Sequence, residues 1–270
     1  SPSTLNYLLY NEWESEKFNN TSTLGWSHLY NYVGGNGKIN FEIVSSSVGS
    51  DYDYSYIKFN TVNKSNIKKF KLNTRVFAQY GTGTDWAGES QLHLAGANSE
   101  ELVENKFTRS NGFIPNDWLG YGAQTNSFHA GGGLNLRGYS GYLAPELDGN
   151  GNYINNYKNT SGVAVNVELE FQKIIPVIKY RRNIKTYLFA DAGMLNNTEI
   201  TRDNVREAFS DLRADAGIGV ALTISNWGTL DMVKPLVLRV DFPMFLNRYP
   251  DVDESALQAN KFVFGIGRAF

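Results

Sequence analysis

The sequence contains no cysteine and no long hydrophobic run. Without cysteine, the 270-residue chain has no disulfides, thiol nucleophiles or cysteine-ligated metal sites. No segment approaches the roughly 20 apolar residues that a membrane-spanning helix requires. The start of the chain also lacks the basic and apolar regions of a signal peptide. The formal net charge of −2 provides no basic field, so we expect no nucleic-acid partner.

Aromatic residues, in contrast, are abundant for so polar a chain. They make up 14% of the sequence, although the mean hydropathy is only −0.36. A transmembrane β-barrel combines these properties, because its strands alternate lipid-facing and lumen-facing residues and keep the average hydropathy low. The composition therefore favours an all-β membrane protein.

Alternation of period two is clearest in the last hundred or so residues. From Val163 to Phe171 every second residue is apolar, whereas Asn166, Glu168 and Glu170 lie on the opposite face. The pattern predicts five strands: Val163–Phe171, Tyr187–Met194, Leu212–Leu222, Leu236–Phe242 and Lys261–Phe270.

The last of these strands is expected to present an apolar face to lipid. Its members are Phe262, Phe264, Ile266 and Phe270. Arg268 interrupts this face, and we expect its long side chain to reach the headgroup level. Gly265 and Gly267 would weaken the pairing of this strand.

Upstream, the alternation is noisier and predicts six more strands. They are Leu5–Trp13, Leu24–Val33, Lys38–Ser45, Tyr52–Val62, Lys69–Tyr80 and Glu89–Ala95. About eleven strands over residues 1–270 indicate a transmembrane antiparallel up-and-down β-barrel. Two connections, Gly96–Thr160 and Asn196–Ser210, are too long for turns, and counting strands back from a periplasmic Phe270 places both outside the cell. A turn or two of helix is expected at Asp203–Phe209.

The first long connection carries a recognisable motif, His129-Ala130-Gly131-Gly132-Gly133-Leu134-Asn135-Leu136-Arg137-Gly138-Tyr139. It resembles the Gly-Gly-x-x-x-(Val/Leu/Ile)-Arg-Gly-(Tyr/Phe) signature of the BamA-type superfamily, the bacterial surface antigen barrels. That family includes outer-membrane insertases and the transporters of two-partner secretion. Five strands follow the motif in the family, as here. Three of them resemble family motifs: Phe189-Ala190-Asp191-Ala192-Gly193, the stretch 212–219, and Leu238-Arg239-Val240-Asp241.

The resemblance implies that this chain is the C-terminal portion of a sixteen-stranded barrel. The first five or so strands and the periplasmic POTRA repeats of the family would then be absent. A complete twelve-stranded barrel is the structural alternative.

The resemblance also implies that the long extracellular loop at residues 96–160 folds back into the lumen. Phe189 and Asp191 point inward by the alternation, so Asp191 can pair with Arg137 while Phe189 stacks on its guanidinium. Gly138 would allow the loop to turn tightly and approach the wall. Tyr139 would pack beside this contact, and Gly193 completes the wall motif. The alternative is an exposed Arg137 without a fixed partner.

Other chemistry-bearing residues do not form a recognisable site. His28, His93 and His129 lack metal-ligand spacing, and the run Asp148-Gly149-Asn150-Gly151-Asn152 lacks the later acidic ligand of a calcium loop. The inward-facing charged residues suit a polar barrel wall better than acid–base catalysis. These are Glu168, Glu170, Asp191, Arg213, Asp215, Arg239 and Asp241. We therefore expect no catalytic residue, no metal and no cofactor.

Taken with the resemblance, these features indicate a non-catalytic barrel of the Gram-negative outer membrane that inserts or translocates client polypeptides. The expected partners are outer-membrane lipid, client polypeptides, and either periplasmic or lipoprotein accessory subunits or the missing N-terminal portion. The alternative from another class is a membrane anchor or display barrel for an N-terminal passenger domain, which itself could be an enzyme. A soluble all-β binding protein is disfavoured, because its final strands would expose large apolar faces.

Overall fold

The computed structural model describes residues 13–14, 16–108, 128–142, 145–147, 153–171, 183–201, 204–225, 235–248 and 262–270. These residues form mostly β-strands, together with the short helix α1 (Ser99–Glu104) and two 3-10 turns, η3 (Gly88–Ser90) and η5 (Arg137–Tyr139). In this part of the chain, no helix has the length and apolar character needed to cross a membrane.

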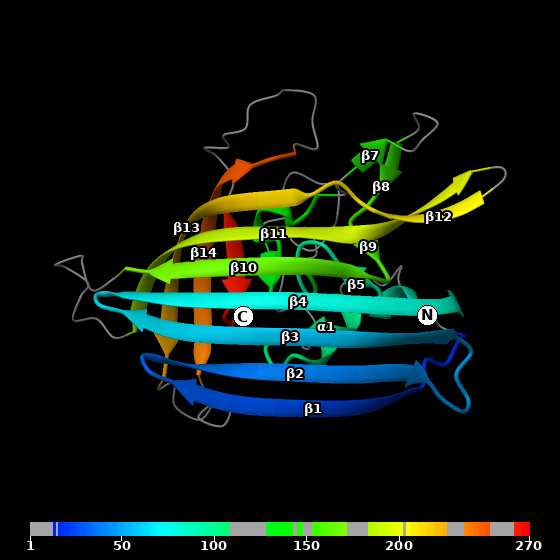
Figure 1. Cartoon of the computed structure of the whole chain (residues 1–270), viewed down its shortest axis with the longest axis horizontal. Helices are drawn as coiled ribbons and strands as arrows, with labels where there is room; N and C mark the ends of the chain where they lie inside the picture. Colours follow the sequence, from blue (N-terminus) through cyan, green and yellow to red (C-terminus); the bar gives the residue numbers. More distant parts are fainter. Residues whose placement is uncertain are drawn as a thin grey trace.

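One large sheet dominates the structure (Figure 1). Nine of its strands follow one another as antiparallel neighbours: β1 (Thr21–Tyr32), β2 (Gly35–Ser46), β3 (Asp53–Ile67), β4 (Phe70–Asp85), β10 (Gly162–Glu170), β11 (Ile184–Thr201), β13 (Arg213–Ile224), β14 (Leu236–Leu246) and β15 (Val263–Ile266). Two more strands complete the 11-stranded sheet. β12 (Asn204–Phe209) pairs with β11, and β6 (Phe128–Ala130) pairs in parallel with the outer edge of β15.

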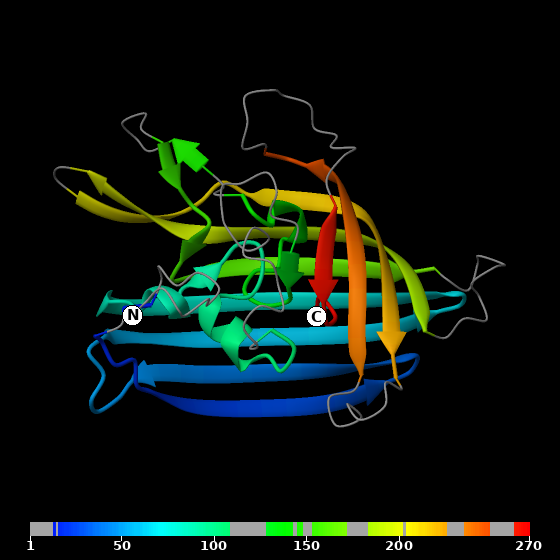
Figure 2. The same ribbon diagram turned by 180° about the vertical axis from the view of Figure 1, so that it is seen from behind.

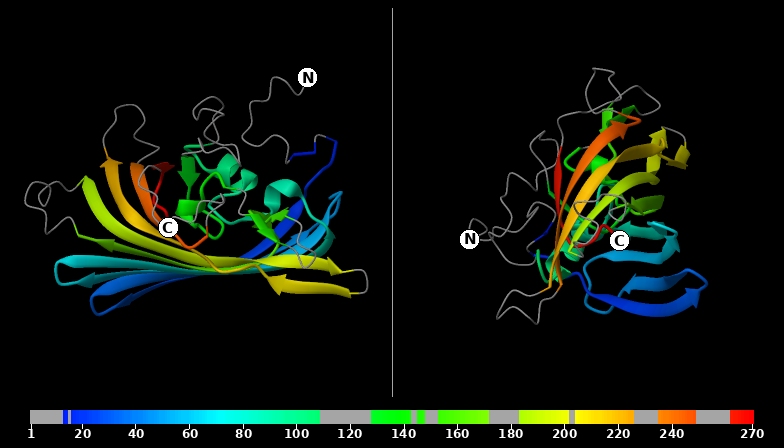
Figure 3. Two further views of the ribbon diagram at one scale, coloured as in Figure 1. Left: turned by 90° about the horizontal axis from the view of Figure 1, so that it is seen from above. Right: turned by 90° about the vertical axis from the view of Figure 1, so that its left-hand side faces the viewer.

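The sheet is strongly curved, and the described residues between β4 and β10 lie on its concave side (Figure 2; Figure 3, left). We call the described residues between these two strands the inner segment. It includes η3, α1, β6, η5 and four short strands, β5 (Leu92–His93), β7 (Pro145–Leu147), β8 (Tyr153–Asn155) and β9 (Lys158–Asn159). β5 pairs with β9, and β7 pairs with β8.

Alternation along the strands gives the sheet two different faces. The concave face carries buried polar and charged side chains, such as Arg75, Asn166 and Asp191, beneath the inner segment. The convex face carries exposed apolar side chains; Val165 and Leu188, for example, are 47% and 49% exposed. The polar-in, apolar-out pattern predicted from the sequence is therefore confirmed.

Apolar side chains of the inner segment pack directly on the concave wall. Leu134 and Leu136, both fully buried, belong to one core cluster with the wall residues Phe77, Ala164 and Leu195. Burial of such side chains is worth roughly 1.5–3 kcal/mol each. The inner segment therefore belongs to the folded core.

Two sequence-based expectations about secondary structure are wrong. The stretch Glu89–Ala95 is not a wall strand: it forms η3 and β5 in the inner segment, where Leu92 and Leu94 are packed into the core. The stretch Asp203–Phe209 contains no helix among its described residues. Instead β12 pairs residue by residue with the end of β11, which runs on to Thr201 and converts the second long connection into a hairpin. The expected strand at Leu5–Trp13 lies almost wholly outside the described residues.

The C-terminal strand is also shorter than predicted. β15 ends at Ile266, after which Gly267 adopts a positive φ of 83° and turns the chain. Phe262 is 47% exposed, whereas Ile266 is 1% exposed. The expectation that Arg268 reaches the lipid headgroups is wrong. Its Nη2 donates to Glu170 Oε1 at 2.8 Å and Glu168 Oε2 at 3.2 Å, because two interior carboxylates offer ion pairs within the reach of the side chain.

Candidate functional site

Arg137 is the centre of a buried ion-pair cluster between the inner segment and the wall. Its side chain is inaccessible to solvent. Nε donates to Asp191 Oδ2 at 2.8 Å, and Nη2 donates to Asp191 Oδ1 at 3.1 Å. Nη1 donates to Glu168 Oε1 at 2.8 Å, and the guanidinium carbon lies 4.4 Å from the centre of the Phe189 ring. We call Arg137, Asp191, Glu168 and Phe189 the arginine cluster.

Strand register explains why the three wall residues meet. In the β10–β11 ladder, Glu168 is directly opposite Phe189, and Asp191 is opposite Asn166. All four alternate onto the concave face and are buried. Gly217, opposite Phe189 on β13, provides space for the aromatic ring, since a Cβ there would lie 2.7 Å from Phe189 Cζ.

The two carboxylates keep Arg137 charged despite its burial. Desolvation lowers the pKa of the guanidinium, but the adjacent charges of Asp191 and Glu168 outweigh this effect and raise it above its usual value. A guanidinium can satisfy both acids at once because its donors form a fixed planar fork. The cluster is therefore a fixed cation held between two fixed anions.

A second set of wall side chains holds the backbone of the inner segment. Arg75 Nη2 donates to Gly133 O at 2.8 Å, and its Nη1 donates to Asn166 Oδ1 at 2.9 Å. Asn166 Nδ2 in turn donates to Asp191 Oδ1 and to the carbonyls of Leu134 and Asn135, at 3.1–3.2 Å. These contacts hold the backbone of Gly133, Leu134 and Asn135, just before Leu136 and Arg137.

Both of these wall residues, and the pairing of Glu168 with Arg137, were missed from the sequence. Their inward alternation is the signal that could have suggested them. The alternation gives the face on which they lie but does not identify which loop atom each one contacts.

The remaining motif residues make close contacts with the same wall. A Cβ on Gly138 would lie 2.6 Å from Asp215 Cβ. Tyr139 is 1% exposed, and its hydroxyl donates to Asn247 Oδ1 at 2.8 Å. A Cβ on Gly193 would lie 3.0 Å from Leu136 Cδ1. The structure thus brings together all six residues singled out in the loop and wall motifs: Arg137, Gly138, Tyr139, Phe189, Asp191 and Gly193.

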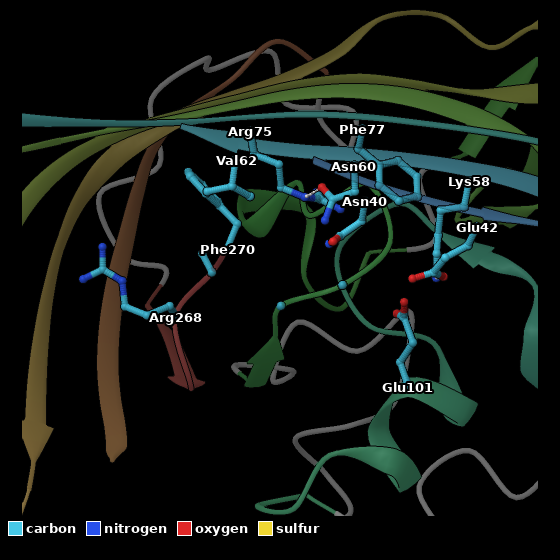
Figure 4. Close-up of a pocket in the computed structure, with 13 residues that line it drawn as sticks. Asn40, Glu42, Lys58, Asn60, Val62, Arg75, Phe77, Glu101, Arg268 and Phe270 are labelled. Atoms are coloured by element: carbon cyan, nitrogen blue, oxygen red, sulfur yellow. Dashed lines mark hydrogen bonds and ion pairs between the residues drawn. The ribbon is translucent and has the colours of Figure 1, made fainter. Parts of the chain in front are cut away.

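The C-terminal residues Arg268 and Phe270 lie next to the arginine cluster. Arg268 contacts Glu168, the same carboxylate that binds Arg137, and the Phe270 ring centre lies 6.0 Å from the Arg137 guanidinium carbon. A pocket of about 280 Å³ separates the C-terminal residues from the wall of β2, β3 and β4 (Figure 4). Its lining includes Asn40, Glu42, Lys58, Asn60, Val62, Arg75, Phe77, Glu101, Arg268 and Phe270.

The three histidines lie on different elements. His28 stacks between Trp26 and Tyr30 on β1, while His93 and His129 are buried in β5 and β6. The expected charged wall residues Arg213, Asp215, Arg239 and Asp241 are likewise buried on β13 and β14. Asp148, Asn150 and Asn152 lie outside the described residues.

Comparison with known proteins identifies a family for this chain. The Omp85 superfamily domain matches residues 9–270 of the chain. No curated protein matches it. Among solved structures, BamA from Haemophilus ducreyi lacking POTRA domains 1–3 is similar, with 19% sequence identity and a TM-score of 0.49. The match covers 90% of this chain and 41% of that chain, so the chain spans less than half the length of this relative.

Proposed function

Because the chain belongs to the Omp85 superfamily, we propose that it forms an outer-membrane barrel wall that inserts or translocates client polypeptides without catalysing a reaction. The observation that supports this best is the two-faced curved sheet. Its convex face offers apolar side chains to lipid, and its concave face buries a charged network. This distribution suits a membrane barrel with a polar interior.

The edge of β1 provides a means of acting on a polypeptide. Within the described residues, β1 pairs with β2 along one side, and no described strand lies along its other side. A strand edge presents backbone N–H and C=O groups to which an extended peptide can add by β-augmentation. Such templating requires no nucleophile, metal or cofactor.

In this proposal the arginine cluster has a positioning role. It fixes the inner segment against the wall, so that the extracellular loop at residues 96–160 is folded back into the lumen of the barrel. Outer-membrane lipid surrounds the convex face. Client polypeptides, and accessory subunits or an N-terminal portion outside this chain, are the proposed protein partners.

Reconstitution in lipid vesicles tests the proposal. The full-length protein that contains this chain should accelerate the insertion of a urea-unfolded eight-stranded outer-membrane protein, followed by its acquired protease resistance. Protein-free vesicles give the baseline rate. An insertion rate equal to this baseline, together with normal levels of other outer-membrane proteins after depletion in cells, would contradict an insertase role.

The same depletion experiment addresses the alternative of an anchor for a passenger domain. Loss of one surface-exposed passenger, with all other outer-membrane proteins at normal levels, would support the anchor.

A further inference from the structure

The outer edge of the C-terminal strand is occupied by the chain's own inner segment. β15 pairs with β14 on one side and with β6 on the other. The β6 pairing matches Phe128 with Phe264, His129 with Gly265, and Ala130 with Ile266. A loop strand therefore covers the backbone edge at which the sheet would otherwise continue.

A charged contact across three strands holds β6 in place. Arg239 of β14, Gly265 of β15 and His129 of β6 form one cross-strand row. Because Gly265 has no side chain, Arg239 passes over it and its Nη2 reaches His129 Nδ1; a Cβ on Gly265 would lie 2.4 Å from Arg239 Nε. Because a guanidinium carries only donors, His129 Nδ1 is the acceptor of this hydrogen bond.

Apolar contacts lie on the other face of the same pairing. Phe128 and Ala130 belong to a cluster with Ile266 and Leu236, and Phe264 packs against it. The strand at this edge therefore makes two kinds of side-chain contact. Alternate apolar residues face a buried cluster, and the residue between them offers a hydrogen-bond acceptor to Arg239.

The pairing is nevertheless the shortest ladder among the described strands of the sheet. β6 has three residues and β15 has four, whereas β4 alone has 16. It is also parallel, in a sheet whose other pairs are antiparallel, and parallel pairing is slightly less stable per residue. Departure of β6 would therefore remove these three residue pairs and none of the antiparallel pairs of the wall.

We propose that β6 is a removable occupant of a strand-accepting site on β15. When β6 leaves, this edge takes an extended client segment with apolar residues on either side of a hydrogen-bond acceptor. The inference rests on the proposed handling of client polypeptides, and it adds where a client pairs and what must first be displaced. Residues 128–130 then act as an internal stand-in for the client strand.

Two matched cysteine pairs test this directly, since the chain has no cysteine of its own. The latch pair is Phe128→Cys with Phe264→Cys, which joins β6 to β15. The control pair is Val240→Cys with Phe264→Cys, which joins β14 to β15 and leaves β6 free to move. Neighbouring strands are about 4.7–4.9 Å apart, within the usual Cα separation of a disulfide.

Both pairs should form disulfides in the full-length protein, and both should insert the unfolded eight-stranded client when reduced. When oxidised, the latch pair should fall to the rate of protein-free vesicles and recover on reduction, while the control pair keeps its rate. Unchanged insertion by the oxidised latch pair would overturn the proposal. So would an equal loss in both oxidised pairs, or failure of the latch pair alone to oxidise.

Peptide capture separates this inference from the proposed function. A peptide with the sequence of residues 126–132, carrying cysteine in place of Phe128, is offered to the single Phe264→Cys variant. Faster mixed-disulfide formation than with a scrambled peptide is expected even if no client is inserted. Equal rates for the two peptides would show that β6 does not vacate the edge, whatever the insertion assay gives.

Discussion

Removal of the Asp191 carboxylate should release the inner segment without unfolding the wall. Asp191→Ala eliminates the 2.8 Å and 3.1 Å hydrogen bonds from the Arg137 side chain and one from Asn166. Breaking a buried ion pair by deleting one partner costs roughly 3–5 kcal/mol. Arg137 retains Glu168 at 2.8 Å, so we take the lower end, about 3 kcal/mol, which corresponds to roughly a hundredfold more frequent opening.

Amide hydrogen exchange and limited proteolysis of the detergent-solubilised protein measure this opening. Exchange at Leu136, whose N–H donates to Leu94 O at 3.1 Å, should accelerate by roughly two orders of magnitude, because local opening sets the exchange rate of such amides. The β10–β11 and β11–β13 ladders should remain protected, since their backbone pairing does not depend on the Asp191 side chain.

Glu42→Ala is the matched control. Glu42 pairs with Lys58 at 2.8 Å on the wall, but both side chains are partly exposed, at 33% and 25%. Such a pair is worth about 0–1 kcal/mol, so its loss should leave Leu136 exchange nearly unchanged. If Asp191→Ala opens the inner segment no more often than Glu42→Ala, the buried cluster does not hold the segment and the positioning role is refuted.

Three further substitutions probe the same region. Glu168→Gln removes the negative charge shared by the guanidinium groups of Arg137 and Arg268. Carboxypeptidase should therefore digest the C-terminus faster, and the inner segment should open more often. A change in only one of these two measurements would disprove the coupling. Gly138→Ala places a Cβ 2.6 Å from Asp215 Cβ and should lower the free energy of unfolding by about 1–3 kcal/mol, measured by thermal unfolding. The control Gly25→Ala, whose nearest neighbouring atom lies at 3.7 Å, should leave it unchanged. Equal effects of the two substitutions would argue against the close approach of Gly138 to the wall. Burial raises the pKa of Glu100, so its ionised form opposes folding at neutral pH. Glu100→Gln should therefore stabilise the protein at pH 7, with a benefit that fades as the pH falls through the raised pKa towards the usual 4.5; a benefit independent of pH would contradict this.

Alternation predicted the wall strands and their faces, because a period of two is imposed by strand geometry itself. It placed Asp191 and Phe189 on the interior, and the motif resemblance then supplied Arg137 as their partner. It failed at Glu89–Ala95, where Leu92 and Leu94 are buried in the core between the inner segment and the wall. A stretch of this length has the same alternating sequence pattern whether it forms a wall strand or packs inside the barrel.

The C-terminus shows a different limit of sequence reasoning. Phe262 and Phe264 continue the expected alternation, but a positive φ at Gly267 ends the strand and sends Arg268 towards the interior. Local pattern alone favours extension to Phe270. The competing attraction comes from Glu168 and Glu170, which lie about a hundred residues earlier in the chain, and such long-range pairing is not encoded in local periodicity.

Strand direction adds a constraint on how the sheet can close. Counted along the antiparallel wall, β1 is the first of nine strands and β15 the last, so the two terminal strands point the same way. β6, parallel to β15, shares this direction. Direct contact between the two ends of the wall would therefore create a parallel seam. A fully antiparallel ring requires an odd number of further strands between β1 and β15, whichever chain or segment provides them. One inserted client strand would meet that requirement, and so would one further strand of the protein itself.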